Sequence, residues 1–137
     1  MNTGKTGIGR FFKGFVYAFE GIVSCIKTER NMRFHIGVAV LVILLMRFYG
    51  LSAAETAAVY ICIGLVISLE LVNTAVEAAV DMACKDKNPL AKKAKDCEAG
   101  AVLISAVASV AVGIRILRDY SAFMAIDYYF DRNILLR

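Results

Sequence analysis

The stretch AAVYICIGLVISLELVNTAVEAAVD, residues 57–81, decides the fold of this chain. Its first half, 57–69, carries no charge and is apolar enough for the interior of a membrane, whereas its second half carries four polar side chains. These side chains, which we call the polar stripe, are Glu70, Asn73, Glu77 and Asp81. Because a helix turns by about 100° per residue, all four lie within about 80° of one another on one face. Charges are costly near hydrocarbon and are usually kept there for function, so the stretch predicts a membrane helix that carries a functional site.

The composition of the whole chain agrees with a membrane protein. The 137 residues are 59% hydrophobic, well above the roughly 45–50% of ordinary globular domains, and contain one proline. The excess apolar residues fall into three blocks, which favours a bilayer over a large soluble core. The four cysteines form no CxxC pair and the chain has one histidine, so we expect free thiols in a reducing compartment rather than a zinc site.

Hydrophobic periodicity predicts an all-α membrane protein that forms one domain over residues 1–137. Its predicted parts are an amphipathic surface helix at 8–28, transmembrane helices at 33–49, 53–82 and 97–117, and a C-terminal tail at 118–137. In that tail, Tyr128, Tyr129 and Phe130 are typical of side chains that anchor at a membrane–water interface. Small residues in the third transmembrane segment would allow helices to approach closely in lipid.

The surface helix has two distinct faces. Four phenylalanines and several aliphatic residues recur with helical period on one face, and basic residues lie along the edge of the other. The apolar face comprises Ile8, Phe11, Phe12, Phe15, Phe19, Ile22, Val23 and Ile26. This pattern is suited to a helix that lies on an anionic membrane surface.

The distribution of lysine and arginine predicts the orientation in the cell membrane. The segment before the first span and the loop at 82–98 are rich in these residues, whereas the turn between the first two spans holds only Arg47. Basic loops stay in the cytoplasm, so we expect the N-terminus and the 82–98 loop on that side.

Acidic residues from three segments are predicted to converge at this cytoplasmic edge. Glu29 precedes the first span, and the loop and the start of the third span add Lys95, Asp96 and Glu98. Carboxylates without cysteine or several histidines suit a hard cation such as Mg²⁺. A deeper carboxylate, Glu70, could accept the proton of a hydroxyl at headgroup level. These features together describe phosphoryl transfer from ATP to a lipid alcohol.

Two other interpretations of the polar stripe remain open from spacing alone. The stripe could pack between helices as a polar seam, or it could line the ion path of a non-catalytic cation-conducting oligomer. The segment TGKT at 3–6 is like the end of a P-loop, but no strand and no first glycine precede it. A kinase built on that fold is therefore not expected.

The pattern ExxNxxxExxxD at 70–81, followed by AKD at 94–96, resembles the signature of the small prokaryotic diacylglycerol kinase family. The resemblance extends from Gly9 to about Leu117. It implies a three-span integral membrane kinase that forms a homotrimer, uses ATP with Mg²⁺, and has its site between subunits. We expect a membrane lipid, ATP and other copies of the chain as partners, and no nucleic acid.

The resemblance also implies roles for individual residues. Glu70 matches the family's proton acceptor, Glu29 and Glu77 match its metal ligands, and Asn73 and Asp81 match supporting polar residues. The matched nucleotide contacts are Arg10, Tyr17, Glu29, Glu77, Asp86, Lys87, Asn88, Lys95 and Asp96.

One segment bears on the acceptor lipid. The residues ERNMRFH at 29–35 resemble the branch of the family that phosphorylates undecaprenol, and Ala99 stands where the diacylglycerol branch tends to have serine. Undecaprenol is therefore the favoured acceptor, with diacylglycerol as the alternative. The expected lipid-binding residues are Arg10, Asn31, Arg33, His35, Glu70 and Ala99.

Overall fold

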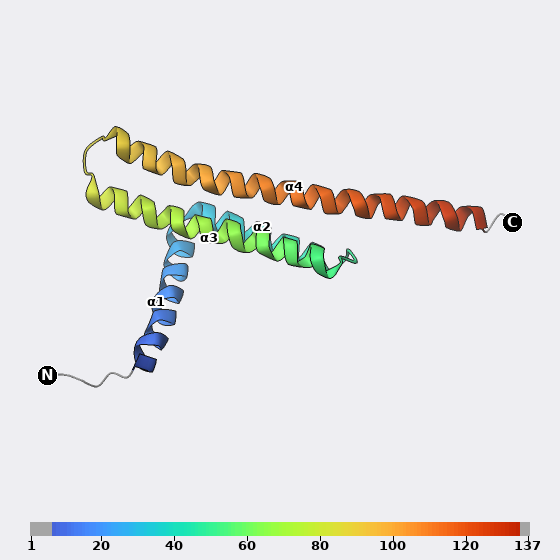
Figure 1. The fold of residues 1–137 in the computed structure, drawn as a ribbon, viewed down its shortest axis with the longest axis horizontal. Coiled ribbons are helices and arrows are strands. Elements are labelled where there is room, and N and C mark those ends of the chain that lie inside the picture. Colours follow the sequence, from blue (N-terminus) through green and yellow to red (C-terminus); the bar gives the residue numbers. More distant parts are fainter. Residues whose placement is uncertain (1–6, 135–137) are drawn as a thin grey trace.

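The computed structural model describes the backbone of residues 7–134 and the side chains of residues 9–121 and 124. The described chain is all-α, which confirms the predicted fold class. Its helices are α1 (Gly7–Thr28), α2 (Arg30–Leu45), α3 (Ala53–Ala83) and α4 (Pro89–Ile134). Figure 1 shows α2, α3 and α4 running side by side, whereas α1 projects away from them.

The corner between α1 and α2 is fixed against α3. Glu29 has an extended backbone, with φ −93° and ψ 124°, and this single residue separates the two helices. The Thr74 hydroxyl on α3 donates to the carbonyl oxygen of Glu70 at 3.1 Å, so its oxygen is free to accept from the buried Cys25 thiol at 3.1 Å. Met32 is fully buried at the start of α2. The end of α1 is therefore held beside the polar stripe.

The turn between α2 and α3 explains where each helix ends. Arg47 and Phe48 donate to the carbonyls of Leu44 and Leu45 in the tighter i→i−3 pattern, so α2 stops at Leu45 rather than at the predicted 49. Ser52 then begins α3 with a capping box. The Glu55 amide donates to the Ser52 hydroxyl oxygen, and the Ser52 amide donates to the Glu55 carboxylate at 2.8 Å.

Helices α3 and α4 form the antiparallel pair on which the fold is built (Figure 1). The connecting loop ends at Asn88, whose side-chain oxygen accepts from the Leu90 amide at 2.8 Å, and Pro89 is the first residue of α4. Across the pair, the Lys95 ammonium donates to the Asp81 carboxylate at 2.5 Å. This ion pair joins the start of α4 to the end of α3 in the observed register.

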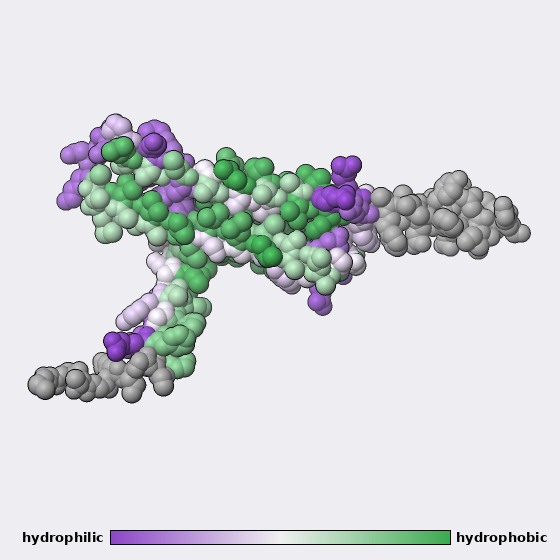
Figure 2. Space-filling view, in the orientation of Figure 1, coloured by the Kyte–Doolittle hydropathy of each residue, from purple (hydrophilic) through white to green (hydrophobic). Residues whose placement is uncertain are grey.

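Two described helices are long and apolar enough to cross a membrane: α3, and the part of α4 from Pro89 to Ser121. Figure 2 shows hydrophilic residues at the α3–α4 loop and again near the grey part of α4, with a hydrophobic surface between them. The 20 residue steps from Lys95 to Arg115 rise about 30 Å in a helix, which is about the hydrocarbon thickness of a bilayer. The 16 residues of α2 rise only about 24 Å, so the predicted span at 33–49 stays a prediction.

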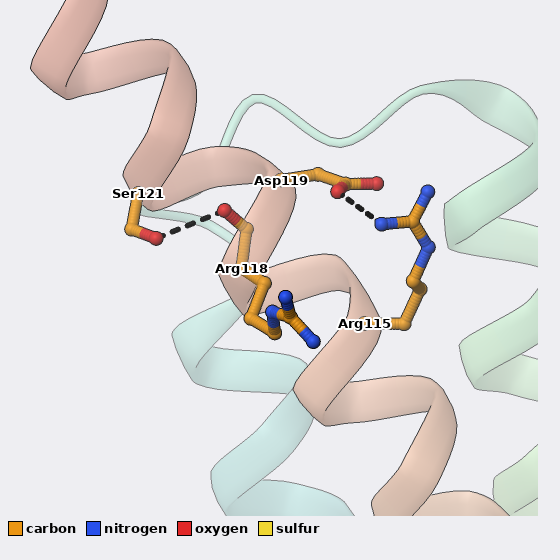
Figure 3. Close-up of polar contacts among 4 residues, drawn as sticks. All are labelled: Arg115, Arg118, Asp119 and Ser121. Atoms are coloured by element: carbon orange, nitrogen blue, oxygen red, sulfur yellow. Dashed lines mark hydrogen bonds and ion pairs between the residues drawn. The ribbon is translucent and has the colours of Figure 1, made fainter.

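The far end of the hydrophobic surface carries its own polar contacts. On α4, Arg115 donates to the Asp119 carboxylate at 2.5 Å, and the Ser121 hydroxyl donates to the Arg118 carbonyl at 2.9 Å (Figure 3). The Tyr120 ring meets Tyr49 from the α2–α3 turn edge to face, with centroids 4.7 Å apart. This level of α4 is therefore tied to the turn.

Helix α4 is longer than the sequence led us to expect. The predicted third span, 97–117, lies within α4, and the helix continues without a break to Ile134 rather than ending where the tail was predicted to begin. Residues 118–134 contain neither glycine nor proline, so no local signal ends the helix at 117. The side chains of Tyr128, Tyr129 and Phe130, predicted as interface anchors, lie outside the described side chains.

Replacing Met32 by alanine is expected to destabilise the fold by about 2–5 kcal/mol, because it opens a cavity where no solvent reaches. Thermal unfolding in detergent micelles would measure the loss. Met82→Ala is the matched control, since Met82 is 79% exposed and should change stability little. Equal unfolding temperatures for the two variants would show that the α1–α2 corner does not support the fold.

Candidate functional site

The polar stripe runs from a buried end to an exposed end along α3. Glu70 is 2% exposed and Asn73 is 8% exposed, Glu77 is half-buried, and Asp81 is exposed near the loop. The gradient follows from the packing of α2, α4 and the α1–α2 corner around the middle of α3. The deepest carboxylate is therefore shielded from water, and the shallower ones face the loop.

The α1–α2 corner brings two more titratable side chains toward the polar stripe. Glu29 stands at the corner itself, and His35 follows on α2, where it lines one space together with Ile67, which precedes Glu70 on α3 by one helical turn. The Glu29 carboxylate is held by the Thr28 hydroxyl, which donates to it at 2.8 Å. The α1–α2 corner thus lies beside the buried end of the polar stripe, and the convergence of these acids at one site stays a prediction.

A pocket of about 610 Å³, which we call the lysine pocket, lies at the α3–α4 loop. Four lysines line it, at positions 85, 87, 92 and 95, together with Asp81, Asp86 and Asn88. Four of the predicted nucleotide contacts, Asp86, Lys87, Asn88 and Lys95, therefore surround one space. Its positive lining suits a polyphosphate. Figure 2 shows the hydrophilic surface at this end of the molecule.

A second space of about 470 Å³, which we call the apolar cavity, lies between α2, α3 and α4. Val66 and Ile67 line it one helical turn before Glu70, and His35 lines it from α2. Apart from His35, its polar lining residues are Cys62 and Ser109, and the Ser109 hydroxyl already donates to the Ser105 carbonyl at 2.8 Å. The cavity is therefore almost entirely apolar, and it ends on α3 one helical turn before Glu70, which does not line it.

Several predicted site residues lie elsewhere in the chain. Arg10 and Tyr17 are exposed on α1, and Arg10 is 18 residues, or about 27 Å of helix, from Thr28. Asn31 and Ala99 are exposed, and neither lines the two spaces. Asp96 is also exposed, and its carboxylate pairs with Lys92. These five residues therefore lie outside the linings of both spaces.

Arg33, predicted to bind lipid, contacts the end of α1 in the structure. Its guanidinium donates to the carbonyls of Lys27 at 2.9 Å and Ile26 at 3.3 Å. These carbonyls belong to the last turn of α1, which has no further helical amides to satisfy them. The contact gives Arg33 a structural role at the α1–α2 corner.

Arg33→Ala is therefore expected to loosen the last turn of α1. Hydrogen exchange of the amides at 24–28 should become roughly fivefold faster, because the loss of a charged hydrogen bond favours local opening. Asn31→Ala, on the same exposed helix start, is the control. Unchanged exchange together with a raised KM for lipid would instead support the predicted substrate contact.

Glu98 is one of the acids that we expect to converge at the cytoplasmic edge, but the sequence predicts no specific role for it. Both of its carboxylate oxygens are enclosed and have no hydrogen-bond partner, and the side-chain oxygen of Asn73 is in the same state. In the part of the chain that the structure describes, no three Asp, Glu, His or Cys side chains come together as a metal site. Mg²⁺, however, is usually held by one or two carboxylates and substrate phosphates, so the oxygen groups present fit that ion.

Comparison with known proteins gives a consistent result. The profile described as prokaryotic diacylglycerol kinase matches residues 16–117. A Bacillus subtilis protein named undecaprenol kinase is 44% identical over 112 residues, which cover 82% of this chain and 91% of that protein. A Synechocystis protein named diacylglycerol kinase is 43% identical over 100 residues, covering 72% of this chain and 57% of that protein. A Haemophilus influenzae protein named diacylglycerol kinase is 31% identical over 100 residues, which cover 73% of this chain and 85% of that protein.

Proposed function

Because the chain belongs to the prokaryotic diacylglycerol kinase family and is an ATP-dependent lipid kinase, we propose that it transfers the γ-phosphate of ATP to undecaprenol. Membership of this kinase family favours catalysis over the alternative hypothesis of a non-catalytic cation-conducting oligomer. Identity alone does not choose the acceptor, since relatives at 44% and 43% identity carry the two different names. The argument for the acceptor therefore rests on the chain's own cavity.

The observation that carries the proposal is the apolar cavity that approaches Glu70. Diacylglycerol has two ester groups whose carbonyls need hydrogen-bond partners when they leave water. The cavity lining offers few such partners, because it is almost entirely aliphatic and its Ser109 hydroxyl is already bonded. A polyprenol has one hydroxyl and a hydrocarbon chain, so its chain suits this lining while its hydroxyl reaches toward Glu70.

In the proposed reaction, Glu70 acts as the general base. The acceptor oxygen attacks the γ-phosphorus, the bond between that phosphorus and the β,γ-bridging oxygen breaks, and ADP leaves. The hydroxyl proton passes to the Glu70 carboxylate, which burial keeps away from competing water. The apolar cavity orients the acceptor along α3.

Mg-ATP is proposed to lie between the polar stripe and the lysine pocket. Glu77, with Glu29 from the α1–α2 corner, would hold the cation, which when bound stabilises negative charge on the phosphates. The lysine pocket would hold the triphosphate through Lys95 and its neighbours, and Asn73 and Asp81 would support the site from α3. The site would lie at the cytoplasmic face of the membrane.

The distant position of Arg10 and Tyr17 supports a site that is shared between subunits of a homotrimer. If α1 of one subunit completes the site of its neighbour, an inactive Arg10→Ala chain and an inactive Glu70→Gln chain should restore activity when they assemble together. The mixed oligomers would be isolated through two different affinity tags before the transfer assay. Mixed oligomers that stay inactive would place the whole site in one subunit.

The acceptor is tested by phosphate transfer from labelled ATP in mixed micelles that contain either undecaprenol or diacylglycerol. We expect a higher kcat/KM for undecaprenol. Ile67→Ser, which adds a hydroxyl to the cavity lining, should reduce that preference, whereas Ile61→Ser, on the exposed surface of the same helix, should not. A higher kcat/KM for diacylglycerol in the unaltered chain would assign the protein to the other acceptor.

A further inference from the structure

Glu98 lies outside the ExxNxxxExxxD and AKD pattern, yet its surroundings are unusual. Both carboxylate oxygens are enclosed between helices and make no hydrogen bond. A carboxylate withdrawn from water without a partner is strongly unfavourable, so such a group usually meets a cation or a donor that completes it.

The register of α3 and α4 places Glu98 opposite Glu77. The ion pair between Lys95 and Asp81 joins the two helices at 2.5 Å, and Glu98 follows Lys95 by three residues, about one helical turn. The charges of Glu77 and Lys95 both act on Glu98. The Lys95 ammonium donates to Asp81, and the carboxylate oxygens of Glu98 still have no hydrogen-bond partner.

A second, independent observation comes from Asn73. Its side chain is more than nine-tenths buried, and its side-chain oxygen has no hydrogen-bond partner. Asn73 lies one helical turn from Glu77 on the same face of α3, toward Glu70. Unsatisfied oxygen acceptors thus come from both helices next to Glu77, and oxygen acceptors are the ligands that Mg²⁺ prefers.

We propose that Glu98 is a further ligand of the divalent cation and that it holds the ion together with Glu77 across α3 and α4. The inference rests on the proposed function, because the phosphates of ATP in the adjacent lysine pocket would complete the coordination. Two carboxylates plus substrate phosphates match the way Mg²⁺ is usually bound.

The test is the binding of Mn²⁺ alone to the purified chain in lipid nanodiscs, measured from the electron paramagnetic resonance signal of the free ion. Glu98→Gln should weaken Mn²⁺ binding by about tenfold or more. Glu98→Asp keeps the charge and should bind more tightly than Glu98→Gln. Asp119→Asn, which removes an exposed carboxylate from the far end of α4, is the control and should leave binding unchanged.

Unchanged Mn²⁺ affinity in Glu98→Gln would overturn the inference, and so would the absence of Mn²⁺ binding by the unaltered chain. If Glu98→Gln fails to fold, equal affinity of Glu98→Asp and the unaltered chain would overturn it, and weaker binding would support it. Phosphate transfer by the unaltered chain is measured in parallel. If the unaltered chain transfers phosphate and Glu98→Gln binds Mn²⁺ as tightly as the unaltered chain, only the role of Glu98 is refuted. If the unaltered chain transfers phosphate to neither lipid, the proposed function is refuted.

Discussion

Glu70→Gln is expected to reduce phosphate transfer by about 10²–10⁴-fold, because the amide cannot accept the proton of the attacking hydroxyl. The substitution preserves the size of the side chain at a position that is 2% exposed. It also removes a buried acid, so the folded chain should be no less stable than before. The two readouts are kcat in the labelled-ATP assay and the unfolding temperature in micelles.

Comparison with Asp119→Asn separates this chemical role from a general effect of charge. Asp119 pairs with Arg115 at the opposite end of the hydrophobic surface (Figure 3), and its loss should leave kcat unchanged. A Glu70→Gln chain that is stable and retains most of its activity would place the general base elsewhere. A chain that loses activity only because it unfolds would show that Glu70 is structural.

Lys95→Met is expected to lower kcat/KM for ATP by roughly tenfold or more, through the loss of a charge-assisted hydrogen bond to phosphate. An ammonium group has three N–H donors. Lys95 gives one of them to Asp81 at 2.5 Å, so the other two are available to a ligand in the lysine pocket. The change should appear mainly in the KM for ATP, with the KM for the lipid preserved.

The partner of this ion pair supplies the control. Asp81→Asn breaks the same salt bridge but leaves the lysine free for phosphate, so its effect on the KM for ATP should be much smaller. Similar losses in Lys95→Met and Asp81→Asn would mean that the pair only fixes the register of α3 and α4. The two variants therefore separate nucleotide contact from structural support.

The helices were largely predictable because their signals are local. Apolar periodicity, Ser52 before α3 and Pro89 at the start of α4 act within a few residues of each helix end. The errors lie where such signals are weak. The end of α2 depends on tighter turn bonds at Arg47, and the length of α4 depends on the absence of any helix-breaking residue after 117.

The candidate site was predictable only in part. The polar stripe follows from spacing on one helix, and the structure adds the α1–α2 corner beside its buried end. The use of Arg33 by the last carbonyls of α1 could not be read from sequence, since it depends on the angle of the α1–α2 corner. The roles assigned to Arg10, Tyr17, Asn31 and Ala99 stay predictions.

The sequence by itself determined that this chain is helical, that its helices suit a membrane, and that four polar residues share one face of α3. These properties depend on helical period and composition, which act along the chain. Tertiary structure alone decided which side chains from different helices meet. It set Glu98 opposite Glu77, gathered the lysines into one pocket and opened an apolar cavity beside Glu70. Contacts of this kind depend on how helices far apart in sequence pack, and no local pattern encodes that register.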